Sequence, residues 1–329
     1  MKKFINKVEN VLTESLSGFA TAHADLVSLQ LDPIFLSRKH KAQNKVAIIS
    51  GGGSGHEPLH AGYIGYGMLD AACPGQVFTS PTPDQMLAAA EAVHAGKGIL
   101  FIVKNYAGDV MNFEMAAEML PFDHATVLTS DDCAVVNSTY TTGRRGVAGT
   151  VIVEKCIGSL AETGASLQAC KALGDKVNVR TASIGAALTS CTVPAAGRPT
   201  FDISDNELEM GVGIHGEPGR RREAMREADE IVKDCVEAIL TDLKPAKDSE
   251  ILLLINGFGA TPLMELYLLY NSAAKLLNQR GLQITRSLVG NYTTALDMAG
   301  ASITVCLLDD EIKQHWDSPV HTPALRWGR

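Results

Sequence analysis

Two histidines stand in loops of glycine, one in each half of the chain. His56 lies in GGGSGHEP (51–58), and His215 lies in GIHGEPG (213–219). Each loop follows an apolar run that we predict to be a strand, and α/β sheets place ligands in the loops at the carboxyl ends of strands. Glycine lets backbone N–H groups come close to a polar ligand, and imidazole serves as nucleophile, acid or base near neutral pH. Both loops are therefore candidate ligand-binding loops.

Each loop also has a simpler interpretation. The four glycines within residues 51–55 can form only a tight turn, and a lone histidine such as His215 is often structural. Phosphate-binding patterns fit the first loop badly, because it lacks both the Lys-Ser/Thr pair of a P-loop and the third glycine of G-x-G-x-x-G. The first loop therefore favours a small polar ligand over a nucleotide.

The first loop overlaps a metal-binding pattern. His56-Glu57-Pro58-Leu59-His60 matches H-E-x-x-H, in which both histidines lie on one face of a helix and bind zinc. Here His56 emerges directly from the glycine loop, and Pro58 fits only the first turn of a helix. No third ligand stands out by its spacing farther along the chain. We predict no metal site.

A lysine and an aspartate flank a short loop at the end of another apolar run. Lys104 follows Ile99–Val103, and Asp109 precedes a stretch whose apolar residues have helical spacing. The two side chains can point into one pocket, where the carboxylate would act as general base toward a substrate hydroxyl. The alternatives are a solvated strand end for Lys104 and a helix N-cap for Asp109.

Short runs rich in Val, Ile and Leu alternate with longer helical patterns, which predicts βαβ units on a largely parallel sheet. Predicted strands cover 46–50, 99–103, 125–128, 208–214, 251–255 and 303–308, and predicted helices cover 110–120, 147–160, 220–242 and 262–277. A stretch rich in Pro, Gly and Ala at 192–199 marks the predicted joint. We predict two α/β domains, residues 1–190 and 191–329, with helices flanking a largely parallel sheet in the first. The loops of His56 and Asp109 fall in the first domain, and that of His215 falls in the second.

Composition and charge exclude several classes of protein. Of the 329 residues, 46% are hydrophobic and 20% are charged, which argues against disorder, collagen and coiled coil. A net charge of -8 argues against nucleic acid as a partner, and no apolar run approaches the roughly 18 residues of a membrane span. The N-terminal stretch lacks the pattern of a signal peptide, and the seven cysteines form no CxxC pair. We predict a cytoplasmic protein with reduced thiols.

Several longer segments closely resemble the dihydroxyacetone kinase K subunit family, and they occur in that family's order over nearly the whole chain. They are SGGGSGHEP (50–58), ACPGQVFTSPTPDQM (72–86), KNYAGDVMNFE (104–114), GRRGVAGTVIVEK (143–155), CTVPAAGRP (191–199), ELEMGVGIHGEPG (207–219), NGFGATPLMELY (256–267) and PVHTPALRWG (319–328). One departure lies at 131–138, where the family usually has an Asp before the Ser. It affects local contacts and leaves the site motifs intact.

The resemblance implies that the chain binds dihydroxyacetone covalently, as a hemiaminal formed when a histidine nitrogen adds to the carbonyl. By motif, His215 is that nucleophile and His56 is its acid/base partner. Asp109 would accept the proton of the hydroxyl that attacks the phosphoryl group, and it completes the implied catalytic set. The implied substrate-binding residues are Gly53, Ser54, Gly55, His56, Lys104 and Asp109.

The resemblance also implies partners. ATP-dependent members carry an additional nucleotide-binding domain, whereas this sequence ends at Arg329, directly after the family's HTPALRWG segment. We therefore expect a separate K subunit of a phosphoenolpyruvate-dependent system. In that system an L subunit holds ADP or ATP with magnesium, and an M phosphocarrier subunit rephosphorylates the nucleotide. The resemblance implies no cofactor on this chain and a homodimer.

Two alternatives remain open at the level of sequence. A K-like paralogue can bind dihydroxyacetone and coactivate a transcription regulator without turnover, and such a protein can keep the histidine at the position of His215. Retention of Lys104 and Asp109 favours the kinase. A K unit for another short ketose or aldose, such as erythrulose, would change the pocket but keep the mechanism.

Overall fold

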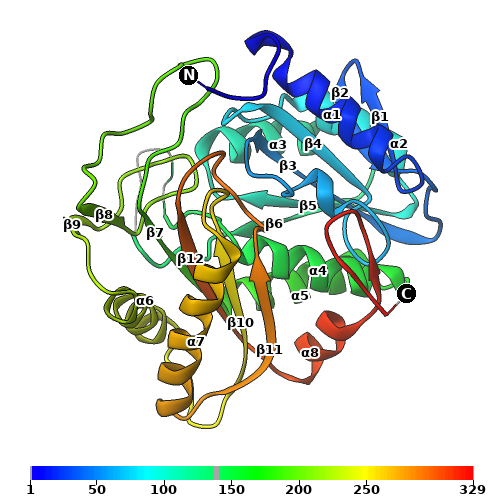
Figure 1. Ribbon diagram of the computed structural model, residues 1–329. Helices are drawn as coiled ribbons and strands as arrows, with labels where there is room; N and C mark the ends of the chain where they lie inside the picture. Colours follow the sequence, from blue (N-terminus) through cyan, green and yellow to red (C-terminus); the bar gives the residue numbers. More distant parts are fainter. Residues whose placement is uncertain (1, 136–140, 142, 329) are drawn as a thin grey trace.

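The computed structural model describes residues 2–135, 141 and 143–328, and two six-stranded sheets form its framework (Figure 1). The first sheet has the order β1-β2-β4-β3-β5-β6, and the second has the order β11-β10-β12-β7-β8-β9. The mixed α/β architecture predicted from the sequence is confirmed. A short hairpin of β13 (Val320–His321) and β14 (Arg326–Trp327) lies near the C-terminus.

The first sheet is largely parallel, as predicted, because β4, β3, β5 and β6 pair in parallel. A hairpin of β1 and β2 joins it antiparallel at one edge. Its strands are β1 (Val27–Leu31), β2 (Ile34–Arg38), β3 (Lys45–Ser54), β4 (Ala71–Val77), β5 (Gly96–Lys104) and β6 (His124–Thr129).

The second sheet is mostly antiparallel, and only its β10–β11 pairing is parallel among the described residues. Its strands are β7 (Thr181–Ala187), β8 (Glu207–Met210), β9 (Arg221–Ala224), β10 (Glu250–Gly257), β11 (Gln283–Gly290) and β12 (Gly300–Leu307). The second sheet already includes β7, so a boundary drawn by sheet membership would lie before Thr181. The division into 1–190 and 191–329 stays a prediction.

Helices cover both faces of each sheet and make a layered molecule (Figure 1). Helices α2 and α3 pack on the outer face of the first sheet, and α6 and α7 pack on the outer face of the second. Helices α4, α5 and α8 lie in a core that both sheets share. The helices are α1 (Val11–Ala22), α2 (Pro83–Val93), α3 (Ala107–Met119), α4 (Gly149–Glu162), α5 (Leu167–Val179), α6 (Ala228–Leu243), α7 (Leu263–Gln279) and α8 (Asp310–Asp317), with short 3-10 turns η1 (Val8–Asn10) and η2 (Ala61–Tyr63).

Strand β10 shows how the sequence produces these layers. Leu252 and Leu254 belong to the core shared with α4 and α5, whereas Ile251, Leu253 and Ile255 belong to the core under α6 and α7. Successive side chains of a strand point to opposite faces, so a strand covered on both sides is apolar throughout.

Three predicted elements differ from those observed by four or more residues at one end. The strand predicted at 46–50 continues as β3 to Ser54, because β4 pairs with residues 51–54 and β5 pairs with Gly51 as well. The helix predicted at 220–242 was wrong at its start, where Arg221–Ala224 pairs with β8 as an edge strand before α6 begins at Ala228. The strand predicted at 208–214 ends at Met210, and residues 211–214 lead into the His215 loop.

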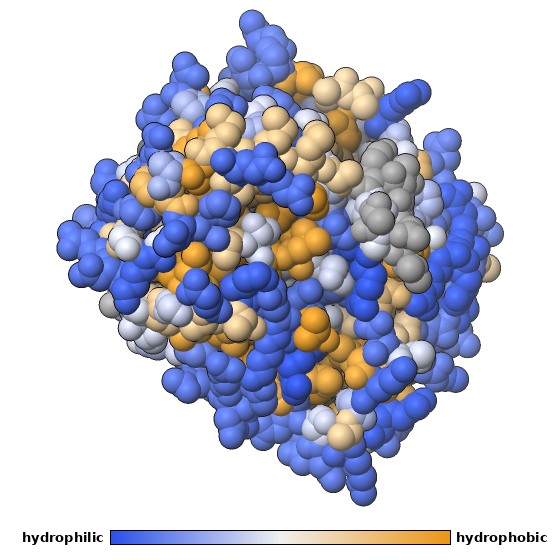
Figure 2. All heavy atoms as spheres, turned by 180° about the vertical axis from the view of Figure 1, so that it is seen from behind, coloured by the Kyte–Doolittle hydropathy of each residue, from blue (hydrophilic) through white to orange (hydrophobic). Residues whose placement is uncertain are grey.

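The surface mixes hydrophobic and hydrophilic residues. Figure 2 shows hydrophobic residues gathered in patches on the face opposite to Figure 1, interrupted by hydrophilic ones. Such mixing is ordinary for the surface of a folded protein. None of the helices in the described part of the chain has the length and apolar character needed to cross a membrane.

Candidate active site

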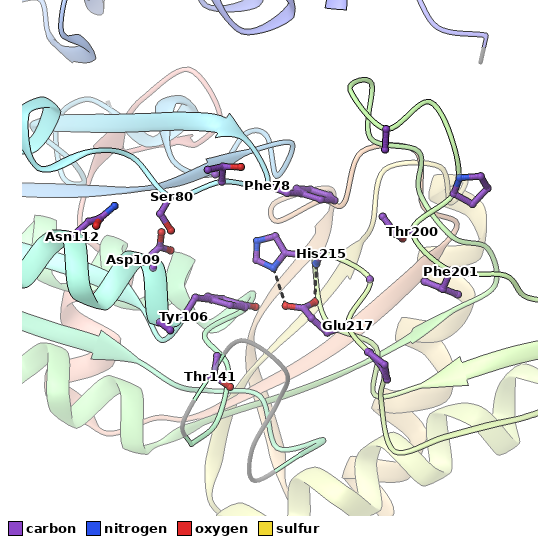
Figure 3. Close-up of a pocket in the computed structure, with 18 of the residues that line it drawn as sticks. Phe78, Ser80, Tyr106, Asp109, Asn112, Thr141, Thr200, Phe201, His215 and Glu217 are labelled. Carbon is purple, nitrogen blue, oxygen red and sulfur yellow. Dashed lines mark hydrogen bonds and ion pairs between the residues drawn. The ribbon is translucent and has the colours of Figure 1, made fainter. Parts of the chain in front are cut away.

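A pocket of about 1220 Å³ lies between the two halves of the molecule (Figure 3). The start of α3 and the loop after β4 line one side, and the loops before and after β8 line the other. Asp109 faces the pocket from the first side, and His215 reaches into it from the second. The pocket therefore brings together side chains that lie 106 positions apart in the sequence.

The glycine run of β3 permits a close approach of neighbouring chain. A Cβ at Gly53 would lie 2.6 Å from the backbone nitrogen of Thr79, and Gly55 has a φ of +105°. Both positions exclude a side chain, the first by contact and the second by backbone conformation. After Gly55 the chain turns into the segment that carries His56.

His56 is fully buried and held by the second half of the molecule. Its Nδ1 lies 2.8 Å from the carbonyl oxygen of Thr294. A carbonyl can only accept, so Nδ1 carries the hydrogen and Nε2 has the free lone pair. Among the described residues Nε2 has no hydrogen-bond partner. Burial, followed by the neighbouring His215 and Lys104, lowers the pKa of His56 well below its usual value, so the ring is neutral near pH 7.

Glu217 fixes the proton of His215. Its Oε1 lies 2.8 Å from Nδ1 of the ring, and its Oε2 accepts from the backbone N–H of His215 at 2.9 Å. Burial opposes the charged form of Glu217, but attraction and hydrogen bonding from His215, with attraction from Arg145, outweigh it and lower the pKa of Glu217 to about 2. An ionised carboxylate only accepts, so Nδ1 of His215 carries a hydrogen, and in the neutral ring the nucleophilic lone pair lies on Nε2.

Aromatic rings surround the imidazole of His215. The ring centroids of His56, Tyr106 and Phe78 lie 4.7, 4.7 and 5.1 Å from that of His215, each nearly perpendicular to it. Phe78 also stacks on His56 at 5.0 Å. Figure 3 shows His215 between Phe78 and Tyr106. These contacts restrict the rotation of the His215 ring.

Lys104 and Asp109 form the polar group on the other side of the pocket. Lys104 ends β5 and is buried, with Nζ 3.4 Å from Oδ2 of Asp109 and 3.3 Å from the carbonyl oxygen of Gly51. Asp109 is the third residue of α3, whose N-cap position is held by Tyr106. Asp109 therefore lies within the first turn and faces Lys104 and the pocket, so the N-cap alternative for it was wrong.

The predicted site residues fall into three groups. Gly53, Asp109 and His215 line the pocket, and the buried His56 and Lys104 contact these residues from behind. Ser54 and Gly55 line a smaller neighbouring cavity of about 400 Å³. The Ser54 hydroxyl donates to the carbonyl of Gly75 at 2.7 Å, so it is occupied within the first sheet.

The H-E-x-x-H segment does not form a helix. Residues 56–60 make turns before η2, and the ring nitrogens of His60 contact Glu154 and Lys104. No cluster of three or more His, Cys, Asp or Glu side chains suited to a metal occurs in the part of the chain that the structure describes.

Sequence reasoning gave no separate role to Glu217 or to the groups behind it. Arg145 is buried next to Glu217, donates from Nε to Asp132 at 2.7 Å and donates from Nη2 to the carbonyl of Gly211 at 2.6 Å. The His-x-Glu spacing of residues 215–217 could have indicated the contact between Glu217 and His215, because a side chain two positions away can reach the ring. Arg145 and Asp132 lie too far from His215 in the sequence for any spacing pattern to indicate their contacts.

Fold and site together define an α/β protein whose pocket brings together His56, His215 and a Lys–Asp pair. These groups can add to a carbonyl and take a proton from a hydroxyl. Residues 17–324 match the Dak1 domain model, and the chain belongs to this family. The resemblance found in the motifs is thereby confirmed.

The chain is similar to proteins with two different roles. It is 48% identical, over the full length of both chains, to the dihydroxyacetone-binding subunit of the PEP-dependent dihydroxyacetone kinase of Escherichia coli. The native dihydroxyacetone kinase of C. freundii aligns with a TM-score of 0.85 and 34% identity, covering 98% of this chain and 60% of that one. A dihydroxyacetone kinase operon co-activator aligns with a TM-score of 0.89 and 33% identity, covering 97% and 98% of the two chains.

Proposed function

We propose that this chain is the dihydroxyacetone-binding subunit of a phosphoenolpyruvate-dependent dihydroxyacetone kinase. The observation that carries the proposal is the position of His215, whose Nδ1 is held by Glu217 and whose ring faces a pocket that also holds Asp109. The 48% identity to the E. coli subunit, over the whole chain, supports the kinase over the co-activator, whose structure is 33% identical.

Covalent capture begins at His215. Nε2 forms a bond to the carbonyl carbon as the second C–O bond breaks onto oxygen, and that oxygen takes up a proton from solvent. The ring keeps its Nδ1 hydrogen, and the ionised carboxylate of Glu217 balances the positive charge of the resulting hemiaminal. The lone pair on Nε2 of His56 accepts a hydrogen bond from the new hydroxyl. Gly53 lines the pocket and would contact the substrate there, and Ser54 and Gly55 would support it from the neighbouring cavity.

This chemistry selects ketones over alcohols of similar size. Glycerol has no carbonyl to which His215 can add, whereas a pocket that works by shape alone discriminates weakly between similar molecules. Erythrulose and other short ketoses or aldoses stay alternatives, because they offer the same carbonyl to His215.

Phosphoryl transfer uses the other side of the pocket. Asp109 accepts the proton of the attacking hydroxyl, and Lys104 contacts the substrate and balances the nearby charge. The pocket volume of about 1220 Å³ far exceeds a three-carbon sugar and leaves room for the approach of a donor group. We propose that an L subunit supplies that donor as nucleotide with magnesium, and that an M subunit recharges it.

The remaining parts of the proposal follow from the family resemblance. We propose a homodimer in the cytoplasm, with no nucleic-acid partner and no cofactor held by this chain. With the proposed domains 1–190 and 191–329, the first contributes His56, Lys104 and Asp109 to the chemistry and the second contributes His215.

Two variants test the assignment. His215→Ala should abolish the ketone adduct, seen as a mass increase on incubation with dihydroxyacetone, because no nucleophile remains. Asp109→Ala should keep the adduct and lose phosphorylation in a complete mixture with an L subunit and its phosphoryl donor. An adduct on His215→Ala would contradict the assignment. An adduct on the unaltered chain without any product in the complete mixture would favour the co-activator.

A further inference from the structure

His60 is the second histidine of the H-E-x-x-H segment, and the proposed mechanism gives it no role. Its side chain is buried, and both of its ring nitrogens have partners. Nδ1 lies 2.6 Å from Oε1 of Glu154 on α4, and Nε2 lies 3.1 Å from Nζ of Lys104 at the end of β5. The ring therefore connects a carboxyl group between the two sheets to a residue of the proposed site.

The partners of His60 determine which ring nitrogen carries the hydrogen. The ammonium group of Lys104 has only donors, so Nε2 accepts from it, and Nδ1 carries the hydrogen and donates to Glu154. Burial, followed by the charges of Lys104 and His56, lowers the pKa of His60 well below its usual value, so the ring stays neutral. Glu154 selects this tautomer because its Oε1 is an acceptor.

Burial also raises the pKa of Glu154, but Glu154 can still accept the hydrogen bond from His60. Burial raises this pKa to about 8, and the positive charge of Lys104 opposes the rise. A carboxyl group keeps an accepting oxygen whether it is ionised or protonated, so Oε1 can accept from His60 in both forms. The side chain of Glu154 is completely buried, so the loss of its contact with His60 would leave a buried polar group without its partner.

Lys104 has three N–H directions, and each has an acceptor. The distances from Nζ are 3.1 Å to Nε2 of His60, 3.3 Å to the carbonyl oxygen of Gly51 and 3.4 Å to Oδ2 of Asp109. The contact with His60 is the shortest. It holds the rotation of the ammonium group so that another N–H points at Asp109, where the attacking hydroxyl would enter.

We propose that His60 and Glu154 are positioning residues for Lys104. Glu154 fixes the tautomer of His60, and His60 fixes the direction of the Lys104 ammonium group beside Asp109. This inference rests on the proposed kinase function, because the aligned ammonium matters when negative charge develops during phosphoryl transfer. Covalent capture of the ketone by His215 does not depend on it.

The test compares variants that keep or remove the accepting and donating groups. His60→Gln can place an amide oxygen near the position of Nε2 and keep an acceptor for Lys104, whereas His60→Asn reaches only toward Glu154 and leaves Lys104 without its acceptor. Glu154→Gln keeps an acceptor for Nδ1, and Glu154→Leu does not. Lys155→Met is the matched control, because Lys155 is also buried on α4 but donates to the carbonyl of His315, away from the site.

Each full-length variant is assayed with an L subunit and its phosphoryl donor for kcat and KM, and separately for the ketone adduct by mass. We expect kcat to fall about 100-fold in His60→Asn and Glu154→Leu, the loss typical of a misplaced catalytic group. The two Gln variants should recover most of this loss, Lys155→Met should keep the kcat of the unaltered chain, and every variant should form the adduct.

Thermal unfolding identifies variants that lose their structure. If Glu154→Leu does not fold, the comparison of His60→Asn with His60→Gln still tests the inference. The inference is overturned if His60→Asn turns over as fast as His60→Gln, because the contact with Lys104 would then not matter. It is also overturned if Lys155→Met loses as much kcat as His60→Asn. A failure of the unaltered chain to form adduct or product would instead contradict the proposed function itself.

Discussion

At the scale of single residues, the two histidines of the site differ in the acceptor that fixes their proton. His56 donates to a neutral carbonyl of Thr294, and His215 donates to the ionised carboxylate of Glu217. A carboxylate stabilises positive charge on the ring far better than a carbonyl does, because hydrogen bonds to ionised groups are about twice as strong. His215 is therefore the better nucleophile of the two histidines. His56 is better suited to stay neutral and accept a hydrogen bond from the hydroxyl of the adduct.

Glu217→Gln should slow adduct formation by about 100-fold or more. The glutamine offers one accepting oxygen where two N–H groups of His215 need acceptors, so the ring loses its fixed tautomer and the carboxylate charge. The measurement is the rate of mass increase with dihydroxyacetone. Glu209→Gln is the control, because Glu209 accepts from Gly219 in the same loop without contacting His215. Equal rates for Glu217→Gln and the unaltered chain would refute this role.

The same carboxylate should contribute to acid sensitivity. The pKa of Glu217 is lowered to about 2 in the folded chain, so its stabilisation is fully present above the unfolded value near 4.5 and is lost as pH falls toward 2. The lowered pKa corresponds to roughly 3 kcal/mol of unfolding free energy at neutral pH. Denaturant unfolding between pH 6 and pH 2.5 should show a steeper loss for the unaltered chain than for Glu217→Gln. If the unfolding free energies of the two proteins fell in parallel with pH, this contribution of Glu217 would be contradicted.

The sequence allowed prediction of residues whose neighbours form a local pattern. His56, His215, Lys104 and Asp109 stand at the ends of apolar runs, and α/β topology brings such ends together. The pairing of His60 with Glu154 joins residues 94 positions apart on a turn and a helix. No local pattern of charge or periodicity indicates that His60 contacts Glu154. This contact can be recognised only in the folded structure.

At the scale of elements, β3 shows how tertiary pairing overrides local preference. Its glycines favour a loop when considered alone, yet Gly51 pairs with both Cys73 on β4 and Val103 on β5. The ladder bonds on both sides outweigh the entropic cost of ordering glycine. The missing side chains also leave room for Lys104, whose Nζ would clash with a Cβ at Gly52.

Helix α4 depends on a similar close approach at Gly158. A Cβ there would lie 2.6 Å from the backbone nitrogen of Met68, so Gly158→Ala should destabilise the chain by about 1–3 kcal/mol despite the better helix propensity of alanine. Gly18→Ala is the matched control, since Gly18 lies on the exposed surface of α1 with nothing within 4 Å, and it should stabilise by up to about 1 kcal/mol. Denaturant unfolding measures both. Stabilisation by Gly158→Ala would show that α4 does not need this contact.

At the scale of the whole molecule, backbone hydrogen bonds join the two halves beside the site. The amide of Leu296 donates to the carbonyl of Gly55 at 2.8 Å, and the amide of Thr294 donates to that of His56 at 3.2 Å. The segment that carries His56 is thus fixed against the second half before any ligand binds. The relative placement of His56 and His215 is a property of the whole fold.

Because groups from both halves surround the ketone, its capture should stabilise the whole molecule. A ligand at 100 times its Kd that binds only the folded chain adds about 2.7 kcal/mol, which corresponds to a rise in Tm of roughly 5 °C. We expect such a rise for the unaltered chain with dihydroxyacetone, and also for Asp109→Ala, which keeps the nucleophile. His215→Ala should show no rise, and glycerol should produce none at the same concentration because it has no carbonyl. Equal shifts for His215→Ala and the unaltered chain would show that the ketone binds without the covalent bond, and the role given to His215 would then be wrong.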